Sequence, residues 1–162
     1  KNQEPYDWII LDAFKSGSIP YHLKTQEFYQ EIKAVLSPGG VVNSNLYGKG
    51  NTLKPRDTKT FLSVFPSIYC FEDDDEVATV LIATDGKRWS EEKIRERALT
   101  SQELPGSFSM SEVAKAYRPG KFQEDSASMF KDTISEEGFL HDVERENLQS
   151  SQGRRYPIIN AY

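Results

Sequence analysis

The front of the chain consists of short apolar runs separated by polar stretches rich in Gly and Pro. The first run, residues 6–14, is continuous, which is typical of a strand buried on both faces in a parallel sheet. Three further strands are predicted at 41–47, 67–71 and 77–84. Only an acidic turn, 72–75, separates the last two, so we expect these two strands to be antiparallel.

The segments between the strands carry apolar residues at helical spacing. Thr25 is a favourable N-cap for a helix that runs to about residue 36 and stops at the Ser-Pro-Gly-Gly sequence 37–40. A second helix is predicted at about 56–64, and a third from Ser90 to about residue 99. This order predicts an α/β fold, in which a parallel sheet carries an antiparallel hairpin at one edge.

The composition changes after Gln102, and no internal repeat is present. Three short elements are predicted beyond it: a capped helix at 109–117, a charged helix at 136–149 and a terminal strand at 156–162. We therefore divide the chain into an α/β domain at 1–102 and a mainly helical C-terminal extension at 103–162. The sequence indicates no role for this extension.

Composition and charge fit one globular domain. The chain has 162 residues, of which 37% are hydrophobic and 28% charged. Its 20 Lys and Arg against 25 Asp and Glu argue against the basic surface of a nucleic-acid-binding protein. No apolar run approaches the ~20 residues of a membrane helix, and the polar N-terminus has no signal-peptide pattern. We therefore expect a cytoplasmic protein without membrane contact.

Metal and disulfide chemistry has little support in the sequence. Cys70 is the single cysteine, which excludes an intramolecular disulfide and a multi-cysteine zinc site. Its apolar surroundings predict a core thiol. His141 has no metal-ligand partner at useful spacing and is expected at the surface, so we expect no metal.

Residues that carry chemistry gather where the predicted strands end. Asp12 follows the first strand, at the sheet edge where α/β folds bind their ligands, and capping the next loop is its alternative role. Asn45 and Tyr47 end the next strand at the same edge and are expected to line a pocket. His22 follows in the loop after Asp12, either as an acid–base partner or as a packing residue of that loop.

One stretch of the chain resembles a known family. The sequence YDWIILDAFKSGSIPYHLKTQEFYQEIKAVLSPGGVVNSNLYG is similar to the spermidine synthase (polyamine aminopropyltransferase) family in the strand ending on Asp12, the TQEFY helix start and the PGG turn. VLIATDGK resembles the final strand of the same group. The resemblance covers residues 6–87 and implies the C-terminal half of a Rossmann-like methyltransferase fold, with an antiparallel last strand.

The resemblance implies transfer of an aminopropyl group from decarboxylated S-adenosylmethionine to the amine of putrescine. Asp12 matches the acid that takes the amine proton, which is needed because a protonated amine is not a nucleophile. By the same resemblance, the acceptor is bound by Tyr21, His22, Asn45 and Tyr47. The adenosyl co-substrate, either decarboxylated S-adenosylmethionine or S-adenosylmethionine itself, is bound by Ala13, Phe14 and Pro20.

Three departures from the family pattern keep other activities open. Lys15 stands where typical members carry a second acid, and its charge would repel a diamine. The family's Tyr-Pro-Ser-Gly segment is absent, although Tyr69 lies nearby, and the acidic run 72–75 is either an amine-binding group or an exposed turn. No Gly-rich adenosyl loop occurs. The alternatives are an S-adenosylmethionine-dependent methyltransferase-like domain with another acceptor, and a non-catalytic remnant of the fold.

The predicted sheet also has an open edge. Residues 6–14 match the fourth strand of the family's fold, and the first three strands have no counterpart in the sequence. An unpaired strand edge favours pairing with another chain. We therefore expect self-association, or a partner that supplies the N-terminal half.

Overall fold

The computed structural model describes residues 4–13, 20–47, 53–65, 67–101, 109–121, 129–132 and 141, without the side chain of Tyr47. Within these ranges the strands are β1 (Tyr6–Leu11), β2 (Leu36–Tyr47), β3 (Ile68–Glu72) and β4 (Ala78–Thr84). The helices are the 3-10 turn η1 (Tyr21–Leu23), α1 (Gln26–Ala34), α2 (Lys54–Val64), α3 (Glu91–Thr100) and α4 (Met110–Lys115).

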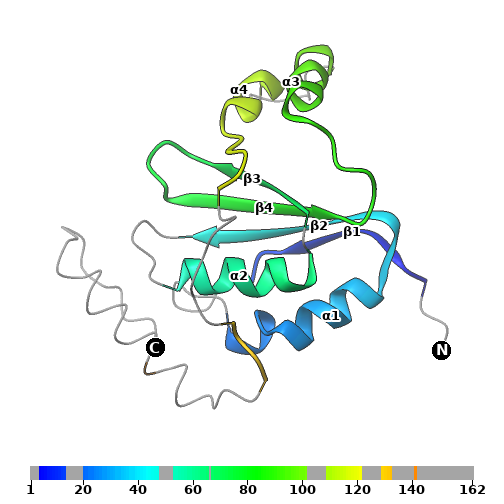
Figure 1. Ribbon diagram of the computed structural model, residues 1–162, viewed down its shortest axis with the longest axis vertical. Helices are drawn as coiled ribbons and strands as arrows, with labels where there is room; N and C mark the ends of the chain where they lie inside the picture. The colour runs from blue at the N-terminus through cyan, green and yellow to red at the C-terminus, as the bar shows by residue number, and fades with distance from the viewer. Residues whose placement is uncertain are drawn as a thin grey trace.

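The four strands form one sheet in the order β1-β2-β4-β3 (Figure 1). β1 and β2 are parallel, whereas β4 runs antiparallel to both of its neighbours, β2 and β3. The predicted α/β class and the antiparallel last pair of strands are confirmed. Because β1, β2 and β3 point the same way, their carboxyl ends share one edge of the sheet, where open α/β sheets bind ligands.

Helices α1 and α2 lie along one face of this sheet and build the core with it (Figure 1). The rings of Tyr29 and Phe61 meet edge to face with their centroids 5.2 Å apart, and Phe65 packs on Phe61 at 4.9 Å. Removing one such buried ring typically costs about 3–5 kcal/mol of stability. Cys70 lies in the same core, so the predicted core thiol is confirmed.

The prediction that the first strand is buried on both faces is wrong. Ile9 and Leu11 pack against the core, but Trp8 and Ile10 on the opposite face are 65% and 55% exposed. β1 is the end strand of the sheet that the structure describes, and α1 and α2 cover only one of its faces. The strand also ends at Leu11, and the remainder of the predicted range reaches residues outside the described ones.

The junction of α1 and β2 differs from the predicted boundaries. Thr25 caps α1 as expected, since its Oγ1 accepts a hydrogen bond from the Phe28 amide at 3.2 Å. The helix ends at Ala34 because the Val35 carbonyl accepts a hydrogen bond from the Tyr6 amide at 2.8 Å, which turns the chain into the sheet. β2 therefore starts at Leu36 rather than at residue 41.

The later helices follow the sequence closely, with one exception. The Ser90 hydroxyl caps α3 by accepting from the Lys93 amide at 3.2 Å, as its position predicts. The capping box predicted for α4 is not formed, because the Ser109 hydroxyl pairs with the Ser111 hydroxyl at 2.6 Å instead of capping the backbone. α4 ends at Lys115, earlier than expected. The elements predicted at 136–149 and 156–162 lie outside the described residues, apart from His141.

The chain after α4 remains attached to the sheet. Tyr117 forms an isolated antiparallel bridge with Phe71 of β3, and the Arg118 amide donates to the Cys70 carbonyl at 2.8 Å. These contacts extend the outer edge of β3 by a short backbone pairing. Among the described helices, none is long and apolar enough to cross a membrane.

Candidate functional site

Asp12 lies directly after the carboxyl end of β1 and is exposed. The next strand supplies its neighbour, because Asn45 of β2 donates from Nδ2 to Asp12 Oδ1 at 3.0 Å. Within the described residues, Oδ2 of Asp12 accepts no hydrogen bond. The predicted meeting of Asp12 and Asn45 at one sheet edge is confirmed, and one carboxylate oxygen stays available to a ligand.

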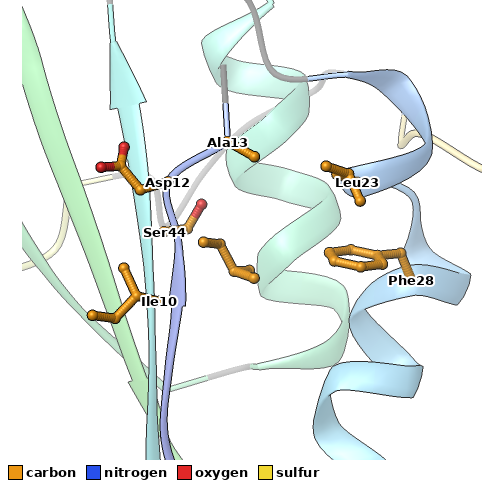
Figure 2. Close-up of a pocket in the computed structure, with 7 residues that line it drawn as sticks. Ile10, Asp12, Ala13, Leu23, Phe28 and Ser44 are labelled. Carbon is orange, nitrogen blue, oxygen red and sulfur yellow. The ribbon is translucent and has the colours of Figure 1, made fainter. Parts of the chain in front are cut away.

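A pocket of about 230 Å³ lies beside this carboxylate (Figure 2). Its walls come from the end of β1, from β2, and from η1 and α1, and consist of Ile10, Leu11, Asp12, Ala13, Leu23, Phe28 and Ser44. In Figure 2 the side chains of Ile10 and Asp12 lie on one side of β1, and those of Leu23 and Phe28 on the other. The pocket therefore lies at the carboxyl end of β1, between this strand and the start of α1.

A buried polar layer supports the pocket from behind. Ser44 is part of the pocket wall and shares a hydrogen bond with Tyr29 of α1. Burial, together with the nearby Asp57 carboxylate, raises the pKa of Tyr29 well above its usual value, and the Ser44 bond only partly offsets this. Asp57 pairs in turn with Lys24, whose Nζ lies 3.0 Å from Oδ1. Tyr29 is therefore neutral at any physiological pH and acts as a support for Ser44.

Of the three residues predicted to bind the adenosyl group, one lines the pocket and one lies in the turn before η1. Ala13 lines the pocket next to Asp12. Pro20 precedes η1, and its carbonyl accepts from the Leu23 amide at 2.9 Å, which shapes the turn that carries the Leu23 wall. Phe14 and Lys15 lie outside the described residues. Adenosyl binding by Phe14 and repulsion of a diamine by Lys15 therefore stay predictions.

The residues predicted to bind the acceptor are not all gathered at Asp12. Tyr21 packs against the buried pair Leu53 and Phe130 on the helix side of the molecule. His22 is exposed, with its ring edge on to Tyr21 at 5.7 Å, and makes no hydrogen bond or ion pair to Asp12 in the part of the chain described. Tyr47 ends β2 with its backbone opposite Ala78.

The acidic run at 72–75 forms the expected exposed turn at 73–75, and only its first residue departs from the prediction. Glu72 belongs to β3 and is buried, and the turn is formed by residues 73–76, where the Asp73 carboxylate accepts from the Val77 amide at 2.7 Å. Lys54 Nζ lies 3.3 Å from Glu72 Oε1, and Lys121 Nζ is bonded to Oε2. The amine-binding capacity of Glu72 is thus taken up by the protein's own lysines. The described residues contain no group of three or more His, Cys, Asp or Glu suited to a metal ion.

The sequence did not single out most of the pocket wall. Leu23 and Phe28 flank the cap Thr25, and Ser44 interrupts the apolar residues of β2, yet none of them has chemistry that marks a site. The one signal is register: Ser44 pairs directly with Leu11, next to Asp12. A polar residue beside the strand that ends on the acid was therefore readable from the sequence once the two strands were aligned.

Comparison with curated proteins finds relatives for part of the chain. The polyamine aminopropyltransferase of Vibrio vulnificus (strain CMCP6) is 40% identical over 73 residues, which cover 45% of this chain and 24% of that protein. The probable polyamine aminopropyl transferase of Bifidobacterium longum (strain NCC 2705) is 33% identical over 67 residues, 40% of this chain and 15% of that protein. The aligned region is thus about a quarter of the length of the first relative. No protein-family profile matches the chain.

Solved structures share the fold over more of the chain. A probable spermidine synthase from Corynebacterium glutamicum ATCC 13032 aligns with a TM-score of 0.56 and 21% identity, over 83% of this chain and 50% of that one. A spermidine synthase in complex with the transition state analogue AdoDATO aligns at 0.52 and 17%, over 72% and 40%. Human methyltransferase-like protein 13 in complex with SAH aligns at 0.51 and 19%, over 83% and 55%.

The chain has the α/β fold of Rossmann-like methyltransferases over about half of the length of the first of these structures, and 45% of it is similar in sequence to a polyamine aminopropyltransferase.

Proposed function

We propose that this chain carries the base of an aminopropyltransferase site, at which an aminopropyl group moves from decarboxylated S-adenosylmethionine to a polyamine acceptor. The observation behind the proposal is the exposed Asp12 carboxylate, which is held by Asn45 and lies beside a largely apolar pocket. The likeness to polyamine aminopropyltransferases supports the same reaction.

Asp12 takes the proton in this proposal. The acceptor nitrogen attacks the aminopropyl carbon bonded to the sulfonium sulfur, and the new N–C bond forms as the C–S bond breaks. The electron pair of the broken bond stays on sulfur, so the product is the neutral thioether methylthioadenosine. The carboxylate holds the ammonium form of the acceptor and accepts the proton that the amine loses. Since Asn45 donates to Oδ1, we assign Oδ2 to the acceptor.

The pocket fits one part of the co-substrate. Leu11, Leu23 and Phe28 offer apolar surface for a flat ring, as adenine requires. Its volume of about 230 Å³ lies below the ~300–1,000 Å³ typical of ligand sites. We therefore assign the ring end of the nucleoside to this pocket, next to Ala13, and expect the rest of the co-substrate to be bound by further residues.

A partner along β1 is part of the proposal. Trp8 and Ile10 are exposed on the uncovered face of this strand, and among the described strands none pairs with its outer edge. We infer that a second copy, or the N-terminal half of the fold, covers this region. Light scattering should then show association that Trp8→Ser weakens, and a clean monomer at all concentrations contradicts this part. The cytoplasmic location expected from the sequence belongs to the same proposal.

Calorimetry with three nucleosides tests the site. Decarboxylated S-adenosylmethionine and methylthioadenosine should bind, and S-adenosylmethionine should bind more weakly. Putrescine aminopropylation should then be lost in Asp12→Asn, while binding of methylthioadenosine is kept. If no nucleoside binds, neither the aminopropyltransferase nor the methyltransferase proposal holds for this chain. If Asp12→Asn turns over like the wild type, Asp12 is not the base.

A methyltransferase-like activity is the second candidate. Lys15, in the place of the family's second acid, disfavours a diamine acceptor. In this case S-adenosylmethionine should bind at least as tightly as its decarboxylated form, and putrescine should not be a substrate. Lys15→Asp separates the two candidates, because it should improve putrescine turnover only in an aminopropyltransferase.

A further inference from the structure

Residues 129–132 of the C-terminal extension pack against the helices that support the pocket. In Figure 1 this gold segment lies beside the start of α1. Phe130 is 1% exposed and forms a buried cluster with Leu53, against which Tyr21 of η1 packs. The Asp132 amide also donates to the Glu27 carboxylate of α1 at 3.1 Å, across 105 positions of sequence. A segment far from Asp12 in the chain is therefore part of the support of the site.

The backbone of Phe130 joins α1 to α2. Its carbonyl accepts from the Gln26 amide at 3.0 Å, and its amide donates to Thr60 Oγ1 at 2.9 Å. The first amides of a helix have no acceptor within the helix, so the Phe130 carbonyl satisfies a group that would otherwise lack one. Thr25 satisfies the Phe28 amide, and the two caps together complete the start of α1.

The ring of Phe130 holds the residue that links η1 to α1. Lys24 Nζ lies 4.8 Å from the ring centroid, and the Arg56 guanidinium carbon lies 4.0 Å from it. Lys24 is 1% exposed and pairs with Asp57 of α2. Cation–π contacts are strongest when they are desolvated, as here. The ring and the ion pair therefore fix Lys24 from two sides.

Both pocket walls that face β1 depend on this junction. Leu23 precedes Lys24 directly, and Phe28 lies in the first turn of α1, and both line the pocket. We propose that segment 129–132 is a positioning latch, which holds the start of α1 and η1 so that Leu23 and Phe28 form the pocket wall. The latch concerns the shape of the pocket, and only its effect on ligand affinity rests on the proposed function.

The backbone bond can be removed alone. Gln26→Pro deletes the amide that donates to the Phe130 carbonyl. The helix tolerates proline here because proline is favoured in the first turn of a helix. Thr25 also already has the extended backbone that the residue before a proline requires (φ −77°, ψ 158°). Gln26→Ala is the matched control, since both variants lose the side-chain bond to Ser63 but only the proline loses the amide. We expect amide exchange at Phe130 to be at least tenfold faster in Gln26→Pro than in Gln26→Ala. Equal exchange in the two variants overturns the latch.

The side chain is tested by Phe130→Ala, with Phe65→Ala as a control that removes a ring of the same size from the main core. Phe130→Ala should speed amide exchange at 24–28 at least tenfold beyond any change in β2 and β4, and Phe65→Ala should not. If Phe130→Ala does not fold, the comparison of Gln26→Pro with Gln26→Ala alone tests the latch.

Ligand affinity separates the latch from the proposed function. Methylthioadenosine, measured where each variant is fully folded, should bind at least threefold more weakly to Gln26→Pro than to Gln26→Ala. Faster exchange in a chain that binds no nucleoside supports the latch and refutes the proposed function. A nucleoside that binds both Gln26 variants equally, with unchanged exchange, refutes the latch and leaves the proposed function standing.

Discussion

Two acids end strands at the same edge of the sheet, and their surroundings are opposite. Asp12, after β1, is exposed and accepts one hydrogen bond from the neutral amide of Asn45. Glu72, at the end of β3, is 3% exposed and is bonded to Lys54, Lys121 and the Thr79 hydroxyl, the last at 2.6 Å. The chain thus neutralises Glu72 with its own amines, whereas in the part of the chain that the structure describes no amine contacts Asp12.

The protonation of Glu72 reflects this difference. Burial raises the pKa of Glu72, but hydrogen bonds from Lys121, Thr79 and Lys54 outweigh burial and hold the pKa below its usual value. The ammonium groups of Lys54 and Lys121 each contact one oxygen of this carboxylate, so both oxygens already have a cationic partner. An acid at this edge is therefore available to a substrate amine only where no lysine of the chain reaches it. This makes Asp12, and not Glu72, the candidate base.

The largest expected effect is on turnover at Asp12. Asp12→Asn keeps an oxygen that accepts from Asn45 but removes the proton acceptor, so aminopropyl transfer should fall by about 10²–10⁴-fold. Its free energy of unfolding should change by less than about 0.5 kcal/mol, because the side chain is exposed. Product formation and urea unfolding measure the two quantities. A variant that retains a tenth of its turnover, or that loses stability, removes the contrast with Glu72.

The matched substitution at the other acid should reverse the pattern. Glu72→Gln leaves Lys54 buried without a carboxylate, and breaking such a pair costs about 3–5 kcal/mol. Since Lys121 is partly solvated, we expect about 3 kcal/mol. Urea unfolding measures this loss, and binding of methylthioadenosine to the folded variant should be unchanged. A Glu72→Gln variant as stable as the wild type would show that the lysines contribute nothing to folding.

The contrast between the two acids also shows what the sequence can predict. The caps Thr25 and Ser90, the antiparallel pair and Asp12 at a strand end are local patterns, and the structure confirms them. The neutralisation of Glu72 is not local, because Lys54 and Lys121 lie 18 and 49 residues from it. No pattern around Glu72 distinguishes a strand-end acid buried with lysines from an exposed turn.

The pocket walls and the exposure of β1 could not be predicted from the sequence, for related reasons. Leu23 and Phe28 are apolar residues without a chemical signature, and they become walls only when η1 and α1 pack beside β1. The continuous apolar run in β1 predicts burial on both faces, but Trp8 and Ile10 have no covering layer in the described residues. Periodicity gives the faces of a strand, whereas the covering of each face depends on segments distant in the sequence.

Acid should weaken the Glu72 contacts selectively. The folded-state pKa of Glu72 is lowered, so its contribution to stability is present above the ordinary glutamate pKa of 4.5 and is lost as the pH falls through the folded value. The difference in unfolding free energy between wild type and Glu72→Gln should therefore be constant from pH 7 to about 5 and shrink below pH 4.5. Urea titrations at pH 7, 5, 4 and 3 measure it. A difference that stays constant to pH 3 would mean that the charge of Glu72 does not stabilise the fold.

The smallest expected effect sharpens the Asp12 side of the comparison. Asn45→Ala removes the hydrogen bond to Asp12, worth about 1 kcal/mol, so transfer should slow by about fivefold as the carboxylate loses its orientation. The substitution also deletes Asn45 Oδ1, a buried oxygen without a hydrogen-bond partner among the described residues, and burying such an atom costs about 1–3 kcal/mol. These two changes oppose each other, so the free energy of unfolding should stay the same or rise.

Asn43→Ala is the control for this substitution. Asn43 lies on the same face of β2 and accepts from Trp8 Nε1 at 2.6 Å, but it does not contact Asp12. Its loss should lower stability by about 1 kcal/mol and leave the transfer rate unchanged, which is the reverse of Asn45→Ala. Equal rates in the two variants would mean that Asn45 does not orient the base. A loss of stability in Asn45→Ala would mean that Asn45 Oδ1 accepts a hydrogen bond in solution. Asn45 would then stabilise the fold, as the lysines around Glu72 do.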